Sequence, residues 1–147
     1  PKLLIADEPT TALDVTVQGQ IIELLSELQQ ESGMGILFIT HDLTIVESIA
    51  DRLLIMYAGQ IVEEGRAGDI LINPKHPYTQ ALLSCAPSLS EKKDILSTIP
   101  GSVPQPGDYP SGCRFHPRCT LAEISCSQEE PILQKIEGRA LRCPVVV

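Results

Sequence analysis

Apolar and polar positions in the first fifty residues follow two different periods. Residues 2–7 form an apolar run that ends in the carboxylate of Asp7, and residues 36–40 form a second run that ends just before His41. Short, continuous apolar runs are typical of parallel strands that are buried on both faces. Between the two runs, apolar residues recur at helical spacing: Val17, Ile21, Leu24, Leu25 and Leu28. The pattern predicts a strand, a helix and a second strand.

Polar residues and glycines mark the ends of the predicted helices. Asp14 can cap the first helix, and Gly33 and Gly35 can stop it. Asp42 can cap a second helix. The apolar face of this second helix would carry Leu43, Val46, Ile49 and Ala50. The order strand, helix, strand, helix predicts an α/β fold with a parallel βαβ unit.

The rest of the chain has a different composition. Residues 52–65 contain two short apolar runs and predict a β-hairpin. Ten of the twelve prolines and all five cysteines lie after Ile72, so we expect a domain boundary at that point. Residues 76–83 predict a short helix, and residues 86–112, rich in Pro, Ser and Gly, predict an extended linker. Residues 113–147 carry four cysteines and are expected to form a small appendage.

The bulk composition excludes some functions. With 43% hydrophobic and 20% charged residues, the chain is globular and not disordered. Its net charge of −8 disfavours a nucleic-acid partner, which a basic patch would have to attract. No apolar run approaches the roughly 20 residues that span a bilayer. Because the chain starts at Pro1, directly in a strand that needs neighbours, we expect it to be a fragment whose upstream half is missing.

The carboxyl ends of the two predicted strands carry the candidate chemistry, since ligands of open α/β sheets bind there. Asp7 can hold Mg²⁺, Glu8 can orient or deprotonate an attacking water, and His41 can contact a terminal phosphate and the same water. A strand-tip acidic pair by itself is a weak signal, because turn and capping carboxylates also occur at such positions.

The motifs around these residues make the identification specific. The segments LLIADEPTTALD (3–14) and ILFITHD (36–42) resemble the ABC-type ATPases, and the match covers residues 1–65 closely. The resemblance implies a Walker B strand and D-loop in the first segment and a switch-histidine loop in the second. It implies that Asp7 is the magnesium carboxylate, Glu8 the catalytic base, Asp14 the D-loop aspartate and His41 the switch histidine.

The resemblance also implies what the chain lacks. The P-loop lysine, the glutamine loop and the signature motif of the family would lie upstream of Pro1. Since the P-loop cradles the β- and γ-phosphates, we expect no ATP hydrolysis from these 147 residues alone. In the family, ATP lies between two subunits, so the complete protein should pair with a second ATPase subunit, as a homodimer or heterodimer.

The second half of the chain identifies the kind of ABC protein. Two segments resemble the C-terminal extension of oligopeptide/dipeptide importer ATPases: NPKHPYTQALLSCAP (73–87) and IPGSVPQPGDYPSGCRFHPRC (99–119). The expected fold is the C-terminal half of a P-loop (ABC-type) nucleotide-binding domain over residues 1–72, with a small cysteine-bearing C-terminal appendage over residues 73–147.

This resemblance implies an ATPase subunit that drives peptide import. It would lie peripherally on the cytoplasmic face of the cell membrane, bind integral membrane permease subunits, and cooperate indirectly with an extracytoplasmic substrate-binding protein. Nickel importers share the tail, so nickel is an alternative cargo. A DNA-repair ABC protein is a further alternative, which the acidic charge and the Pro-rich tail disfavour.

The cysteines suggest a metal centre. Cys113, Cys119, Cys126 and Cys143 are separated by five, six and sixteen residues, so no pair has the two-to-four-residue spacing usual in structural zinc sites. Iron–sulfur clusters tolerate wider spacing and take four thiolates, and the resembling importer tails hold a four-iron four-sulfur cluster. A cluster is therefore expected, with unmetallated thiols and a zinc site as the alternatives.

Several neighbouring residues bear on this site. Arg114, Arg118 and Arg142 lie beside the cysteines in the sequence and could offset thiolate charge. Cys85 lies apart on the predicted helix and is expected to be a packed thiol, while His116 could substitute as a ligand. If the tail is the functional part of the chain, the protein would instead act as a metal-binding interaction module.

Overall fold

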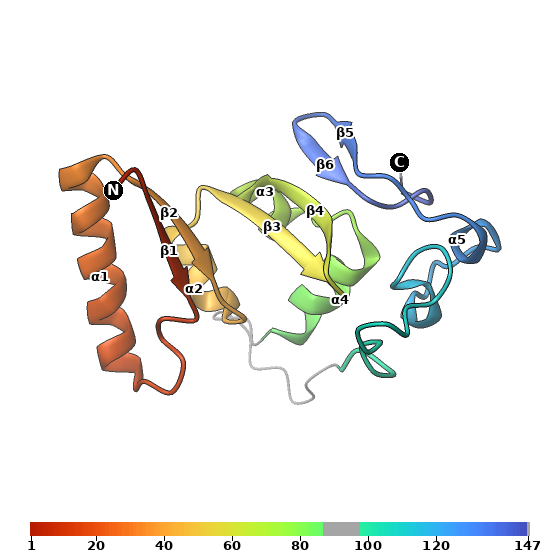
Figure 1. Ribbon diagram of the computed structural model, residues 1–147, viewed down its shortest axis with the longest axis horizontal. Helices are drawn as coiled ribbons and strands as arrows, with labels where there is room; N and C mark the ends of the chain where they lie inside the picture. Colours follow the sequence, from red (N-terminus) through yellow and green to blue (C-terminus); the bar gives the residue numbers. More distant parts are fainter. Residues whose placement is uncertain (87–97, 147) are drawn as a thin grey trace. The chain divides into compact units, whose positions relative to one another are not determined.

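The computed structural model describes residues 1–86 and 98–146. The chain divides into two compact units, Pro1–Ile49 and Ala50–Val147. Figure 1 labels their helices and strands, and each unit is described by itself below. The predicted boundary at Ile72 lies inside the second unit, so the end of the ATPase domain at that residue stays a prediction.

The first unit is the predicted βαβ arrangement followed by a helix. Strand β1 (Leu3–Asp7) pairs in parallel with β2 (Gly35–Ile39), in a register that places Asp7 beside Ile39. Helix α1 (Val15–Ser32) connects the two strands, and α2 (Leu43–Ile49) follows β2. The parallel pairing confirms the βαβ prediction and brings the ends of both strands to the same edge.

The ends of α1 follow the predicted signals. The side chain of Asp14 accepts a hydrogen bond from the main-chain N–H of Val17 at 2.9 Å, which satisfies one of the free donors of the first turn. At the other end, Gly33 adopts φ 66°, a left-handed conformation that glycine takes without steric cost, and its N–H bonds to the carbonyl of Gln29.

Burial of the strands differs from the expectation. On one face of the pair, Ala6 is buried and Ile36 and Phe38 are half-buried. The opposite face leaves apolar side chains 43–61% exposed: Leu3, Ile5, Leu37 and Ile39. Burial on both faces is therefore wrong for the described residues, because within them β1 and β2 form a two-stranded sheet with one face uncovered.

The second unit is built on an antiparallel sheet in the order β3-β4-β6-β5. Its strands are β3 (Arg52–Tyr57), β4 (Gln60–Arg66), β5 (Gln134–Ile136) and β6 (Arg139–Leu141). The predicted hairpin over residues 52–65 is confirmed as β3 and β4. Its two-residue turn has positive φ at both Ala58 and Gly59, the geometry that matches the twist of paired strands.

The described residues of this unit also form four short helices: α3 (Ala67–Ile72), α4 (Pro77–Cys85), the 3-10 helix η1 (His116–Arg118) and α5 (Ser125–Gln128). Helix α4 confirms the prediction for residues 76–83, with His76 as its N-cap and Pro77 in its first turn. Within the predicted linker 86–112, residues 87–97 lie outside the described part of the chain, and residues 98–112 form turns without a helix or strand.

The cysteine-bearing tail shares its core with the preceding residues. Strand β6 pairs with β4, where Leu141 lies opposite Glu63, and the main-chain N–H of Arg142 bonds to the carbonyl of Val62. The ring of Phe115 packs against Tyr57 and Tyr78, with centroid distances of 5.1 and 5.4 Å. Residues 113–147, which were expected to form a small appendage, therefore contribute strands and side chains to the core of the second unit.

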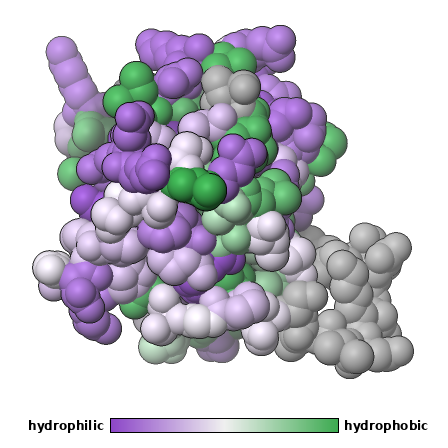
Figure 2. Space-filling model, turned by 90° about the vertical axis from the view of Figure 1, so that its right-hand side faces the viewer, coloured by the Kyte–Doolittle hydropathy of each residue, from purple (hydrophilic) through white to green (hydrophobic). Residues whose placement is uncertain are grey.

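On the face shown in Figure 2, hydrophilic and hydrophobic residues are intermixed. Isolated exposed apolar side chains, such as Ile124 and Ile132, are normal on a globular protein. In the part of the chain that the structure describes, no helix combines the length and apolar character required to cross a membrane.

Candidate active site and a four-cysteine cavity

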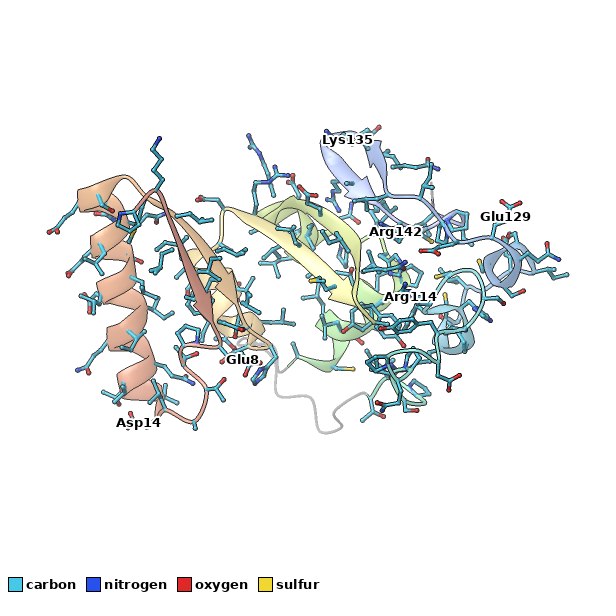
Figure 3. The ribbon with its side chains drawn as sticks, viewed as in Figure 1. Glu8, Asp14, Arg114, Glu129, Lys135 and Arg142 are labelled. Carbon is cyan, nitrogen blue, oxygen red and sulfur yellow. The ribbon has the colours of Figure 1, made fainter. Side chains whose placement is uncertain are left out.

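Glu8 and His41 meet at the shared edge of β1 and β2. Because the strands are parallel and adjacent, the residues that follow them leave the sheet side by side, and the N–H of Glu8 bonds to the carbonyl of Ile39 at 2.9 Å. The His41 Nδ1 atom lies 3.2 Å from Glu8 Oε1. Both side chains are accessible to solvent, and Figure 3 labels Glu8 after the end of β1. The structure thus brings together the two predicted catalytic residues.

Thr11 is a third member of this arrangement that the sequence analysis missed. Its hydroxyl donates a hydrogen bond to Glu8 Oε2 at 2.9 Å, and its N–H bonds to the main-chain carbonyl of Glu8 at 3.1 Å. A hydroxyl three residues after a turn carboxylate is the available sequence signal. Hydrogen bonds from His41 and then from Thr11 lower the pKa of Glu8, outweighing the opposing effect of burial. The carboxylate therefore stays ionised and able to accept a proton.

The turn after β1 requires an unusual backbone. Glu8 adopts φ 46° and Ala12 adopts φ 65°, the left-handed region that non-glycine residues rarely enter. Strained backbone of this kind concentrates at functional sites, where the surrounding structure holds it in place. Here the holding bonds are those of Glu8 to Ile39 and of Thr11 to Glu8.

The two remaining aspartates of the prediction are placed differently. Asp7 is exposed at the end of β1, next to Glu8, where its carboxylate could bind a hard cation such as Mg²⁺. Asp14 lies at the N-terminus of α1, where its carboxylate is committed to the helix cap. The magnesium role of Asp7 and the D-loop role of Asp14 stay predictions.

The four tail cysteines line one cavity of about 10 Å³, together with His76, Pro77, Phe115 and His116. Cys113 and Cys119 flank η1, Cys126 lies in α5, and Cys143 follows β6. Cysteines that are up to thirty residues apart in the sequence therefore line the same cavity. Cys85 is half-buried at the end of α4 and is not part of the cavity wall.

Gly112 allows two of these segments to approach closely. The N–H of Cys113 bonds to the carbonyl of Cys126 at 2.8 Å, and the Ser111 hydroxyl bonds to the carbonyl of Ser127 at the same distance. Gly112 lies between these bonds with φ 69°, and a Cβ atom there would overlap the carbonyl oxygen of Cys126. Only glycine combines this conformation with this contact.

The thiols are close enough to influence one another. Burial raises the pKa of both Cys113 and Cys119, and the neighbouring Cys143 and Cys126 raise each of them further. Both side chains are therefore neutral thiols near pH 7 in the metal-free protein. Among residues 1–86 and 98–146, no three His, Cys, Asp or Glu side chains are arranged to hold a single metal ion.

The three arginines beside the cysteines make hydrogen bonds to main-chain carbonyls, and their effect on thiolate charge stays a prediction. Arg114, which Figure 3 labels, donates to the carbonyl of Ala58 and stacks on the ring of Tyr109. Arg118 donates to the carbonyls of Ile99 and Pro100, and Arg142 donates to those of Ile61 and Pro131. The guanidinium groups satisfy main-chain acceptors and tie the loops down, and none of these bonds goes to a thiol.

His76 is the most buried polar residue of the cavity wall, with 1% of its surface exposed. Its Nδ1 accepts the main-chain N–H of Tyr78 at 3.0 Å, and its Nε2 has no hydrogen-bond partner among the described residues. Burial lowers the pKa of His76 to about 4, against the opposing effects of the Glu63 carboxylate and the Arg142 carbonyl. The ring is therefore neutral near pH 7.

Glu63 fixes the backbone that carries this histidine. Its carboxylate is fully buried and accepts the N–H of Lys75 at 2.9 Å, the N–H of His76 at 3.0 Å and Nη1 of Arg139 at 3.3 Å. A buried carboxylate needs such a full set of donors, because desolvated charge is costly unless it is paired. This clamp joins β4, the start of α4 and β6.

Comparison with known proteins finds sequence relatives over nearly the whole chain. Residues 62–126 match the family model described as the oligopeptide/dipeptide transporter, C-terminal region. The chain is 56% identical over 144 residues to a peptide import ATP-binding protein of Brucella melitensis. It is 54% identical to the dipeptide transport ATP-binding protein of Escherichia coli and 50% identical to an oligopeptide transport ATP-binding protein of Bacillus subtilis.

These matches cover 97–98% of this chain but only 43–44% of each relative, so the chain spans less than half of their length. The names of these relatives refer to peptide, dipeptide and oligopeptide transport. The parallel strand pair with its Glu8–His41 contact, the matching C-terminal region and the identity along nearly the whole chain agree. Over nearly its whole length the chain is similar to peptide, dipeptide and oligopeptide transport ATP-binding proteins, and its residues 62–126 match the C-terminal region of the oligopeptide/dipeptide transporter family.

Proposed function

We propose that the complete protein hydrolyses ATP to drive the import of peptides. The observation that carries this proposal is the contact between Glu8 and His41 at the ends of two adjacent parallel strands, with Thr11 as a second donor to Glu8. The printed names of the relatives supply the substrate class, since they refer to peptide, dipeptide and oligopeptide transport.

In this mechanism Glu8 orients a water molecule and accepts its proton. The bonds from Thr11 and His41 hold the carboxylate in one position, so a water bound to its free lone pairs has a defined direction. His41 is exposed, and when its ring is protonated the second N–H, on Nε2, can donate to a phosphate oxygen. The exposed carboxylate of Asp7 would hold Mg²⁺, which neutralises phosphate charge when it is bound.

Partners and location follow from the same proposal. A second ATPase subunit would complete the nucleotide site, with Asp14 near the shared boundary, and integral permease subunits would carry the peptide. The protein would then lie on the cytoplasmic face of the membrane. The acidic net charge of −8 supports the absence of nucleic acid among its partners.

The test is Glu8→Gln in the complete protein, reconstituted with its membrane subunits. Glutamine keeps the size of the side chain but removes the proton acceptor, so turnover should fall by about 10²-fold or more while ATP binding persists. Glu47→Gln is the matched control, because it makes the same charge change at an exposed site of α2. Wild-type turnover in Glu8→Gln would refute the proposed role.

A second candidate function concerns the tail, which we propose binds an iron–sulfur cluster. Four thiols line one cavity, and the chain has no other group of cysteines. A zinc ion would require the ligands to converge on a single atom, which the described side chains do not do. In a four-iron cluster each thiolate binds a different iron atom, so wider separation is tolerated.

The residues fit a cluster in donor type and in their arrangement around one cavity. The cavity of about 10 Å³ has room for about one water molecule, so the cysteine loops would have to move apart on binding. Bound metal would also displace the protons of the thiols, which links affinity to pH. The group would supply a covalent connection between η1, α5 and the end of β6.

Elemental analysis of protein purified without oxygen tests this proposal. Serine at any one of the four positions should lower the iron content: Cys113, Cys119, Cys126 and Cys143. Cys85→Ser is the control and should leave it unchanged, because Cys85 is outside the cavity wall. Stoichiometric zinc without iron, or no metal at all, would refute the cluster.

A further inference from the structure

The backbone and one ring nitrogen fix the orientation of His76. Its main-chain N–H is held by the buried carboxylate of Glu63, and its Nδ1 accepts the N–H of Tyr78 at the start of α4. The ring also lies against Phe115, with centroids 6.0 Å apart. The imidazole therefore has one defined position, set by two hydrogen bonds and one aromatic contact.

These bonds also determine the tautomer. Because a main-chain N–H can only donate, Nδ1 must offer its lone pair to Tyr78. In the neutral ring the proton is then on Nε2, which becomes a donor and has no lone pair for a metal. His116, which lines the same cavity, is the opposite case: its Nδ1 lies 2.9 Å from the carbonyl of Cys113 and must donate to it.

The Nε2–H group of His76 needs an acceptor. It is buried and without a hydrogen-bond partner among the described residues. The Arg142 carbonyl lies near the ring and is one nearby acceptor. Native proteins rarely leave a buried donor unsatisfied. The ring belongs to the wall of the cavity whose other walls carry the four cysteines. The sulfur atoms of the four cysteines are therefore among the acceptors in that wall.

We propose that His76 donates a hydrogen bond from Nε2 to a sulfur atom of the metal centre held by the four cysteines, and thereby sets its reduction potential. The inference rests on the proposed cluster. Reduction adds negative charge to the sulfur atoms, so a donor stabilises the reduced form more than the oxidised form and raises the potential. His76 is a positioning residue in this role, because its tautomer excludes it from ligation.

Substitution by two amide residues separates the two roles of His76, the helix cap at Nδ1 and the hydrogen-bond donor at Nε2. In His76→Asn the side-chain oxygen can replace Nδ1 as the cap, but the short side chain places no donor where Nε2 was. In His76→Gln the longer side chain can place its amide N–H near the former Nε2 position. Thr79→Val is the control, since Thr79 is equally buried and unpaired on the same helix but is not part of the cavity wall.

The experiment measures iron content and the midpoint potential of the protein purified without oxygen. We expect wild-type iron in His76→Asn, with the reduction equilibrium shifted about tenfold toward the oxidised form, a shift of about −59 mV for a one-electron couple. His76→Gln and Thr79→Val should keep the wild-type potential. If His76→Asn loses its iron, the test rests on His76→Gln, which should keep both its iron and the wild-type potential.

The outcomes distinguish the inference from the proposal beneath it. Wild-type protein that contains no iron would refute the cluster and the role of His76 together. Iron at the wild-type level with an unchanged potential in His76→Asn would refute the role of His76 alone. Loss of iron in both amide variants, or a shifted potential in His76→Gln, would also refute the donor role, because the ring would then be required for another reason.

Discussion

The clamp made by Glu63 predicts a large loss of stability when its carboxylate is removed. Glu63→Ala would leave the main-chain N–H groups of Lys75 and His76 without acceptors and would remove the carboxylate from Arg139. Each buried donor that loses its acceptor costs about 1–3 kcal/mol, and breaking a buried ion pair costs about 3–5 kcal/mol. Because these effects overlap, we expect a loss of about 3–5 kcal/mol.

A graded series makes the prediction sharper. Glu63→Gln keeps the shape and one oxygen, but its NH₂ group faces one of the main-chain donors, so we expect a smaller loss of about 1–3 kcal/mol. Glu64→Ala is the matched control on the same strand. Glu64 pairs with Arg52 at 2.7 Å on the solvent side, and an exposed pair of this kind contributes about 0–1 kcal/mol.

Tyrosine fluorescence during urea unfolding measures this series. The chain has no tryptophan, and its three tyrosines, Tyr57, Tyr78 and Tyr109, all lie in the second unit, so the signal reports the unit that contains Glu63. The midpoint should fall while the slope stays constant. A reducing agent and a chelator in the urea solutions exclude any contribution of disulfides or bound metals to the measured stability. Glu63→Ala that is no less stable than Glu64→Ala would refute the clamp.

The remaining predictions concern the active site, the cysteine loops and the chain by itself. Since the Thr11 hydroxyl lowers the pKa of Glu8, Thr11→Val should move the acid limb of the kcat/KM profile of the complete protein upward, toward the ordinary pKa of 4.5; an unmoved or lower limb would contradict this. Gly112→Ala should destabilise the second unit by more than Gly107→Ala, which changes another glycine with positive φ but meets no atom within 4 Å; equal midpoints in urea would exclude the close approach to Cys126. The 147 residues alone contain no G-x-x-x-x-G-K motif and should neither bind nor hydrolyse ATP in calorimetry and phosphate-release assays, so micromolar binding would place the nucleotide site elsewhere.

Local sequence signals were sufficient for the first unit and its candidate site. Short apolar runs, a helical repeat, the Asp14 cap and the stop at Gly33 predict β1, α1 and β2 because each signal acts within a few residues. Parallel strands bring their carboxyl ends to one edge, so the proximity of Glu8 and His41 also followed from the order of elements. Thr11 was missed, because its bond depends on the left-handed turn at Glu8.

In the second unit, the sequence predicted the hairpin at residues 52–65 and the helix at residues 76–83. It did not predict α3, or that β6 would pair with β4, since strand partners distant in the chain are chosen by packing rather than by local pattern. For the same reason the sequence did not predict that the arginines beside the cysteines would donate to carbonyls of other segments.

The sequence by itself determined which chemical groups this protein has: a strand-tip acid pair, a histidine after the next strand, and four cysteines without zinc-finger spacing. The tertiary structure decided which of these groups meet. It placed the four thiols around one cavity and put His76, identified in the sequence only as part of a family motif, in the wall of that cavity with a buried, unpaired Nε2. The physical reason is that donor and acceptor pairing inside a protein depends on which backbone segments approach one another, and long-range packing sets that approach.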